Sequence, residues 1–249
     1  MADPTDAADT LPAALPEIEP EPALVPVVPG ALRGRAWLTL QTRRAQTLVR
    51  GSAPRPGRSA VVGLGRFGRE VGYIAAWAAA GELYARWWVE RIERGLGEAE
   101  CTVAAIGADA QRRLASIEGV EFEVARSVEP LRLLLDLGHP LAFRGAYLVA
   151  AYDRVARTVL TARHVGLTTQ EEGAQLLDAA FHPVRRSQAR ALGYRFLGVK
   201  AEDVVEGSAR YREAVAVMGE LPRRFVDGGE GDSEADESDL DEPSDPKAL

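Results

Sequence analysis

The sequence predicts an α+β protein that is mostly helical, and three patterns support this fold class. From Tyr73 onward, apolar residues recur over long stretches at three- and four-residue steps, as they do on one face of a helix. One stretch nearer the N-terminus instead alternates apolar and polar residues, as a half-buried strand does. Both ends of the chain are rich in Pro, Ala, Asp and Glu and poor in aromatic residues, which is typical of disordered tails.

These patterns divide the 249 residues into four parts. We expect disordered acidic tails at residues 1–30 and 227–249, an N-terminal folded region at 31–98, and a helix-rich region with short strands at 99–226. Because 46% of the residues are hydrophobic, the folded middle can bury a core as one large domain or as two small ones.

The charge of the chain is distributed unevenly. The net charge is −7, but the first 30 residues contribute −6 and the last 23 contribute −9, so the middle of the chain carries +8. Between Glu21 and Glu70 there is no carboxylate, and the arginines there are Arg33, Arg35, Arg43, Arg44, Arg50, Arg55, Arg58, Arg66 and Arg69. A block of one sign within a folded region is typical of a surface that binds a polyanion such as nucleic acid. A codon bias would explain arginine in place of lysine, but not the missing acids.

Residues 32–41 have the period of a half-buried strand. The face that would pack on a core carries Leu32, Gly34, Ala36, Leu38 and Leu40. The opposite face carries Arg33, Arg35, Trp37, Thr39 and Gln41. In the major groove of DNA, arginine can bond guanine, glutamine can bond adenine, and threonine can offer its hydroxyl or touch a thymine methyl. The alternative is an ordinary edge strand that charged residues protect from further pairing.

Two helices are expected after this strand. A short one over residues 42–50 would have Thr42 near its N-cap, and a longer one would begin with Ser59 as its N-cap. This order is the outline of a ribbon-helix-helix-like element, in which strands of two chains pair into a ribbon that enters the major groove. The residues that would hold DNA phosphates in such an element are Arg43, Arg44, Arg58 and Ser59.

Residues 63–68 read GLGRFG and match the GxGxxG motif of dinucleotide-binding folds. That fold also needs a buried strand before the glycines and a second strand that ends in an acidic residue about 20 residues later. Here the preceding apolar run is only residues 60–62, and Glu82 lies within a helical pattern. We therefore expect no cofactor and interpret the glycines as sites of close packing. A dinucleotide-dependent enzyme or sensor is the remote alternative.

The rest of the folded region is predicted to be helical with one short β-hairpin. A long helix would span about 81–116, broken or bent near Gly95, Gly97 and Gly107, and strands at 120–124 and 131–135 would form the hairpin. Further helices are expected at 141–164, from Thr168 or Thr169 onward, and at 201–218. At the start of the second, Thr168 with Glu171, or Thr169 with Glu172, would form a capping box. Pro183 should kink or interrupt the second of these, and Pro222 should help to end the third.

Patterns for catalysis, metal binding and membrane insertion are weak. His139, His164 and His182 have no acidic or nucleophilic partner at a recognisable spacing, and Cys101 is the single cysteine. We therefore expect no enzyme activity and no structural metal. The longest apolar run, residues 73–81, is too short to span a bilayer, and the N-terminus lacks a signal-peptide pattern. A cytoplasmic protein without membrane contact is the expectation.

Six stretches, in order over nearly all of residues 31–222, carry a resemblance to a known family. They are LRGRAWLTLQTRRAQTLV (32–49), SVEPLRL (127–133), FRGAYLVAAYD (143–153), LTARHVGL (160–167), VRR (184–186) and GYRFLGV (193–199). Together they resemble the integrating conjugative element proteins related to the AcaB-like transcriptional activators of conjugative plasmids. The resemblance implies a DNA-binding regulator of transfer genes that dimerises through a ribbon-helix-helix element, with the ribbon over residues 33–41.

Two function classes therefore lead. The first is a homodimeric regulator that binds double-stranded DNA sequence-specifically. The second is an accessory protein of the conjugative transfer machinery, whose basic N-terminal region docks an acidic partner. The acidic C-terminal tail could contact RNA polymerase or the transfer machinery, compete with DNA for the basic region, or only add solubility.

Overall fold

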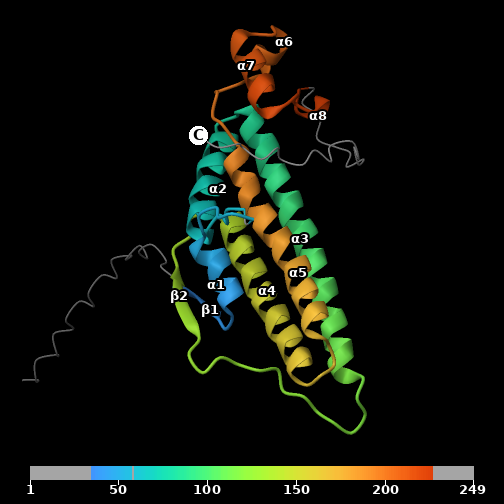
Figure 1. Cartoon of the computed structure of the whole chain (residues 1–249). Coiled ribbons are helices and arrows are strands. Elements are labelled where there is room, and N and C mark those ends of the chain that lie inside the picture. The colour runs from blue at the N-terminus through green and yellow to red at the C-terminus, as the bar shows by residue number, and fades with distance from the viewer. Residues whose placement is uncertain (1–34, 58, 227–249) are drawn as a thin grey trace, which may run out of the picture. The chain divides into compact units, whose positions relative to one another are not determined.

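The long helices of this protein lie side by side, and a two-stranded sheet packs against one of them (Figure 1). The structure is a computed structural model that describes residues 35–57 and 59–226. The predictions for Arg33, Arg58 and the two acidic tails lie outside these residues. The elements are β1 (Ala36–Leu40), α1 (Arg43–Arg50), α2 (Leu64–Ala79), α3 (Leu83–Ala115), β2 (Leu131–Leu135), α4 (Pro140–His164), α5 (Gln170–Arg190), the 3-10 turn η1 (Ala191–Gly193), α6 (Ala201–Val205), α7 (Ala209–Met218) and α8 (Arg223–Val226).

The core lies between helices α2, α3, α4 and α5. Helix α3 packs on α2, α4 and α5, and α4 also packs on α2 and α5. Large side chains from three helices are fully buried there, among them Phe67, Tyr84, Ile92 and Tyr152. Burial of this apolar surface is the main source of stability for the four helices. The expected class, mostly helical with a small β component, is confirmed.

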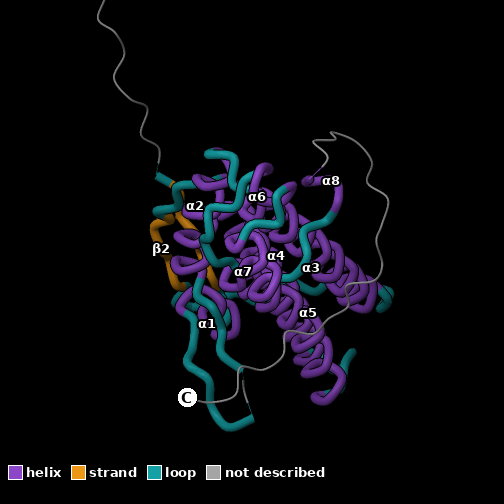
Figure 2. Tube along the Cα trace, turned by 90° about the horizontal axis from the view of Figure 1, so that it is seen from above, coloured by secondary structure: helices purple, strands orange, loops and turns teal. Residues whose placement is uncertain are grey.

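The sheet joins two segments that are far apart in the sequence. β1 pairs antiparallel with β2, with Trp37 opposite Leu134 and Thr39 opposite Arg132, and in Figure 2 the two orange strands lie beside α1 and α2. Leu131 and Leu135 pack against the core and so extend the apolar face that Leu38 and Leu40 begin. The strand that we expected to pair with a second chain thus has its partner within the same chain.

The hairpin predicted between residues 120–124 and 131–135 is wrong, because residues 120–127 form no strand. This segment is instead tied to α4 through its main chain. Arg157 donates to the carbonyls of Val124 and Ala125, at 3.3 and 2.8 Å, and the N–H of Ala125 donates to the Thr161 hydroxyl at 3.0 Å. Because the main-chain groups of Val124 and Ala125 are bonded to α4, this segment does not pair with β2. Strand β2 pairs with β1 instead.

Helix α1 begins as predicted, whereas α2 does not. Thr42 is the N-cap of α1, and its hydroxyl accepts from the N–H of Ala45 at 3.3 Å. Helix α2 begins at Leu64 after Gly63, so the prediction of a helix start at Ser59 is wrong. A Cβ on Gly63 would lie within 2.9 Å of main-chain atoms of Val49 and Arg50 at the end of α1. This close approach, together with the Ser52–Val61 bridge, fixes where α2 starts.

The glycine motif therefore serves packing at two of its positions. A Cβ on Gly68 would lie 2.7 Å from the Leu137 side chain, whereas Gly65 has nothing within 4 Å. The residues before the motif form only the isolated Ser52–Val61 bridge, and the sheet of the described residues is a single antiparallel pair. The second parallel strand that a dinucleotide site requires is thus missing from the part of the chain that the structure describes.

Two further helix predictions are wrong where they expected a break. Helix α3 runs unbroken for 33 residues through all three of its glycines, and the expected domain boundary between residues 98 and 99 falls inside it. Gly95 makes room for Arg190 of α5, whose guanidinium bonds the Arg91 carbonyl and pairs with Glu98. Helix α5 continues through Pro183, because Ala180, Val184 and Ser187 on its inner face are buried in the core. Its predicted capping box forms between Thr169 and Glu172.

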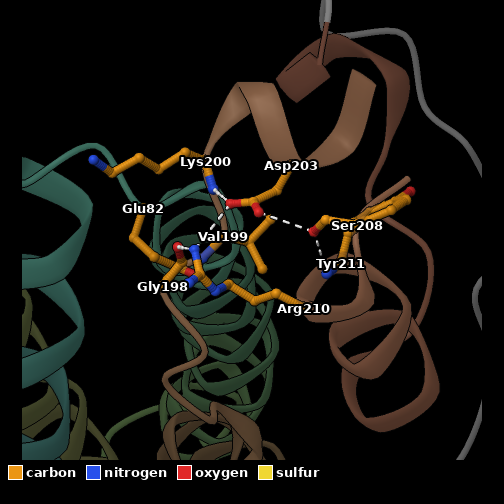
Figure 3. Close-up of polar contacts among 8 residues, drawn as sticks. All are labelled: Glu82, Gly198, Val199, Lys200, Asp203, Ser208, Arg210 and Tyr211. Carbon is orange, nitrogen blue, oxygen red and sulfur yellow. Dashed lines mark hydrogen bonds and ion pairs between the residues drawn. The ribbon is translucent and has the colours of Figure 1, made fainter. Parts of the chain in front are cut away.

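The C-terminal segment forms two short helices, α6 and α7, where one was predicted. Gly207, at φ 60°, and the Ser208 N-cap separate them, and Gly219, at φ 91°, follows α7 before Pro222 is reached. Buried Glu82 at the start of α3 accepts from the N–H of Val199 at 3.2 Å, while Asp203 accepts from the N–H of Lys200 and from Ser208 (Figure 3). The Glu82–Val199 bond attaches the segment to the start of α3, and the Asp203 bonds hold the segment together internally.

Candidate nucleic-acid interface

The outer face of β1 carries the side chains that the alternation predicts. Arg35, Trp37 and Thr39 are exposed, while Leu38 and Leu40 are buried against the core. Trp37 is 47% exposed although it is a large aromatic residue. An indole usually becomes buried when a fold offers room for it, so its position on the surface suggests a partner that is not part of this chain.

Strand β2 contributes two residues to the same outer face, and our sequence predictions missed both. Arg132 holds its guanidinium carbon 4.5 Å from the centroid of the Trp37 ring, and Leu134 lies opposite Trp37 and is 51% exposed. The signal was present in the LRLLL sequence of residues 131–135, where the single arginine stands between leucines. Assigning this strand to a local hairpin hid its relation to β1.

Gln41 lies at the end of the outer face and is half-buried. Its side-chain oxygen accepts from the main-chain N–H of Ser127 at 2.8 Å, and its main-chain N–H donates to the Asp153 carboxylate at 2.9 Å. The side chain thus helps to hold the segment before β2 in place. A contact with a base would have to come from its amide nitrogen.

The two arginines that begin α1 have different surroundings. The Arg43 side chain is exposed and makes no ion pair with any described residue. Arg44 makes an ion pair with Asp178 of α5, at 2.5 Å. Burial alone would lower the pKa of the Arg44 guanidinium, but the hydrogen bond that Arg44 donates to Asp178 and the electrostatic interactions with Tyr152 and Asp178 together outweigh burial, so the pKa is raised above its ordinary value. Arg44 is therefore charged, with part of its charge balanced within the chain.

Ser59 is exposed in the connection between α1 and α2, four residues before the N-cap of α2. No helix dipole supports an anion at Ser59 itself, because that effect falls off beyond the first turn. Arg35, Trp37 and Thr39 are thus brought together on one surface, while Arg43 follows on α1 and Ser59 lies on a separate loop.

Comparison with known proteins bears on what this surface does. The family described as transcriptional regulator AcaB matches residues 28–236, which is most of the chain. The chain belongs to the AcaB family of transcriptional regulators. The matched range includes every described element, so the AcaB assignment covers both the sheet and the helices that support it.

The other comparisons add little to the AcaB assignment. A search of the curated proteins found no match. Among solved structures, the chain is similar to selenomethionine-containing AcaB from uropathogenic E. coli, with 13% identity, a TM-score of 0.49, and coverage of 78% of this chain and 95% of that one. At that TM-score the likeness bears on no detail of the fold.

The described part of this AcaB-family chain shows neither a metal-binding cluster nor a membrane-spanning helix. Within residues 35–57 and 59–226, no group of three or more His, Cys, Asp or Glu residues could hold a metal ion. No helix among these residues is both long and apolar enough to cross a membrane.

Proposed function

We propose that this AcaB-family regulator binds double-stranded DNA sequence-specifically, with the outer face of the β1–β2 sheet in the major groove. The observation that carries the proposal is that Trp37 and Thr39 of β1 are exposed together with Arg35, which immediately precedes the strand, and that the strand has no carboxylate. Arginine and threonine are side chains that contact base edges, and the aromatic ring adds apolar contact. The proposed function is regulatory, and it involves no catalytic step.

Several arginines elsewhere in the chain have their charge balanced by a carboxylate of the same chain. Arg144 pairs with Glu100 at 2.7 Å, Arg190 with Glu98 at 2.9 Å, and Arg113 with Asp109 at 2.9 Å. Arg35 and Arg43 make no such pair among the described residues. Unpaired guanidinium groups on a rigid surface are available to an external anion, and neutralising phosphates supplies much of the affinity for DNA.

The same proposal gives the residues around the sheet a role at the phosphates. Arg43 fits it directly, because it is exposed at the first turn of α1, where the helix dipole also favours an anion. Arg44 would have to share its charge between Asp178 and a phosphate. Arg58 and Ser59 belong to the α1–α2 connection and would contact the backbone only if this loop reaches the duplex.

We further propose a homodimer that acts on transfer genes of an integrating conjugative element. The resemblance of residues 31–222 to that group of proteins supports the genetic context. A dimer would place two sheets on two half-sites about one helical turn apart, roughly 34 Å, which is the usual spacing for dimeric regulators.

The test is selection of DNA by the full chain. Fragmented DNA from the host is incubated with the purified protein at about 0.15 M salt, and the retained fragments are sequenced. We expect fragments that share a motif, together with a sedimentation profile of a dimer. An Arg35→Ala variant should lose the motif, whereas Arg86→Ala, which removes an exposed arginine at the start of α3, should retain it. Retention without a common motif, or capture of a protein that persists at high salt, would favour the docking alternative.

A further inference from the structure

We infer that the DNA-binding ribbon is complete within a single chain, and that Arg132 of β2, which lies opposite Thr39 of β1, contacts a base edge. This inference rests on the proposed function and adds a second strand and a further specificity residue to it. The usual ribbon-helix-helix ribbon takes one strand from each of two chains. Here β2 occupies the place of the second strand.

The register brings the outward residues of the two strands together. Trp37 is directly opposite Leu134, and Thr39 is directly opposite Arg132. Residues directly opposite each other in an antiparallel pair lie about 5 Å apart and point to the same side of the sheet. The outer face of both strands together consists of Arg35, Trp37, Thr39, Arg132 and Leu134.

The guanidinium of Arg132 is held in place without using its hydrogen-bond donors. It stacks on Trp37 with 4.5 Å between the guanidinium carbon and the ring centroid. Stacking engages the flat face of the group, whereas the five N–H donors lie in its plane. Among the described residues, Arg132 makes no hydrogen bond or ion pair. A stacked guanidinium with free donors is prepared for bidentate contact with guanine, because less side-chain entropy is lost when it binds.

The charge and size of the face also suit a duplex. Neither strand contains a carboxylate, and the acids flanking β2 in sequence, Glu129 and Asp136, come just before and just after it. Two paired strands lie about 4.8 Å apart, so a two-stranded ribbon fits the major groove, which is about 12 Å wide. The inner face is fixed on the core by Leu38 and Leu40, so the ribbon is presented by a rigid support.

The experiment compares the DNA affinity of four full-length proteins: wild type, Arg132→Ala, Arg132→Lys and the control Arg86→Ala. The probes are a duplex that the wild-type chain recovers from host DNA and a scrambled duplex of the same length and composition. Fluorescence anisotropy gives both dissociation constants for each protein. Thermal unfolding of each variant checks that the fold is kept, which we expect because Arg132 is exposed.

Arg132→Ala should weaken binding to the recovered duplex by about 5- to 150-fold, the range for a lost bidentate base contact. It should change binding to the scrambled duplex much less. Arg132→Lys should keep the affinity for the scrambled duplex and still lose discrimination, because an ammonium cannot bond guanine in the bidentate way. Arg86→Ala should behave as wild type on both probes.

Two results would overturn the inference while leaving the proposed function intact. One is unchanged discrimination by Arg132→Ala when Arg35→Ala has lost it, which would confine base contact to β1. The other is full discrimination by Arg132→Lys, which would make Arg132 a phosphate contact. If the wild-type chain itself prefers neither probe, the proposed function fails first.

Discussion

Asp153, which is buried on α4, accepts two hydrogen bonds from Thr42 at the junction between β1 and α1. Its carboxylate accepts from the Thr42 N–H at 2.8 Å and from the Thr42 hydroxyl at 2.7 Å, and it also accepts from the N–H of Gln41 at 2.9 Å. Only 4% of Asp153 is exposed. A single carboxylate on a central helix therefore sets the position of the ribbon and of the first turn of α1.

Replacing Asp153 should destabilise the fold and misplace the ribbon. In Asp153→Asn, one acceptor oxygen becomes an NH₂ donor that faces other donors, so at least one buried hydrogen bond is lost. We expect the free energy of unfolding to fall by about 2–4 kcal/mol, measured by urea denaturation. Asp109→Asn is the matched control, since among the described residues Asp109 makes ion pairs only with Arg112 and Arg113 on the surface of α3, and it should cost less than about 1 kcal/mol. Equal losses in the two variants would contradict the anchoring role.

The glycines of the GLGRFG motif should respond in opposite ways to a methyl group. In Gly63→Ala the new Cβ meets main-chain atoms of Val49 and Arg50 at 2.8–2.9 Å, so α1 and α2 must separate. We expect a loss of about 1–3 kcal/mol of stability. Gly65→Ala meets nothing within 4 Å and lies in the first turn of α2, so it should be neutral or stabilising by up to about 1 kcal/mol.

A nucleotide-binding role for these glycines would give a different outcome. Both substitutions would then abolish a thermal shift caused by excess NAD, NADP or ATP. We expect no such shift in the wild-type chain, because the antiparallel pair in the described residues provides no second parallel strand beside the motif. A shift that either alanine removes would restore the dinucleotide alternative.

The stability of the C-terminal segment should depend on pH through Glu82. Burial raises the pKa of this carboxyl above its ordinary value, although hydrogen bonds from Ala85, Val199 and Tyr194 lower it in part. In the window between the pKa of the unfolded chain and the higher pKa of the fold, the folded state binds more protons, so stability falls as the pH rises through that window. Urea denaturation at a series of pH values should show this decline in wild type and a smaller one in Glu82→Gln. Parallel profiles of stability against pH in wild type and Glu82→Gln would contradict a role of Glu82 in this pH dependence.

Alanine variants of Arg35 and Arg43 should lose DNA binding in different ways if the proposed roles are correct. Removal of Arg43 should weaken binding to all duplexes alike and reduce the slope of log affinity against log salt by about one unit, because one phosphate contact is lost. Removal of Arg35 should instead relax the preference for the recovered motif. Titrations of the two alanine variants at several salt concentrations separate these effects. A changed motif preference in Arg43→Ala would contradict the phosphate role of Arg43 and would assign it to a base contact.

Local sequence patterns predicted several of the elements that form the candidate site. The alternation over residues 32–41 identified which of the described side chains of β1 face outward, because a strand has a period of two and one of its faces must be buried. Thr42 as an N-cap and Thr169 with Glu172 as a capping box were equally local, since each involves groups within one helical turn.

Predictions that depended on long-range contacts were less successful. The helix start at Ser59 was wrong because close packing of Gly63 on α1 fixes the start of α2. No break occurs at Gly95 or Pro183, because burial along α3 and α5 outweighs the low helix propensity of these residues, and the alternative of a bend or kink stays a prediction. The role of Gln41 as a base contact stays a prediction, and the sequence did not show that its side-chain oxygen accepts from the N–H of Ser127, more than eighty residues away.

The sequence by itself determined the balance of helix and strand, the basic middle of the chain, and the outward face of β1. Tertiary structure alone decided that β2 is the partner of that strand, that Arg132 stacks on Trp37, and that Asp153 holds the junction. The physical reason is that strand pairing and buried hydrogen bonds join residues about ninety or more positions apart. A leucine-rich segment such as residues 131–135 can pair with any apolar strand. It pairs with β1 because β1 packs on α4 and the inward leucines of both strands contact the same core.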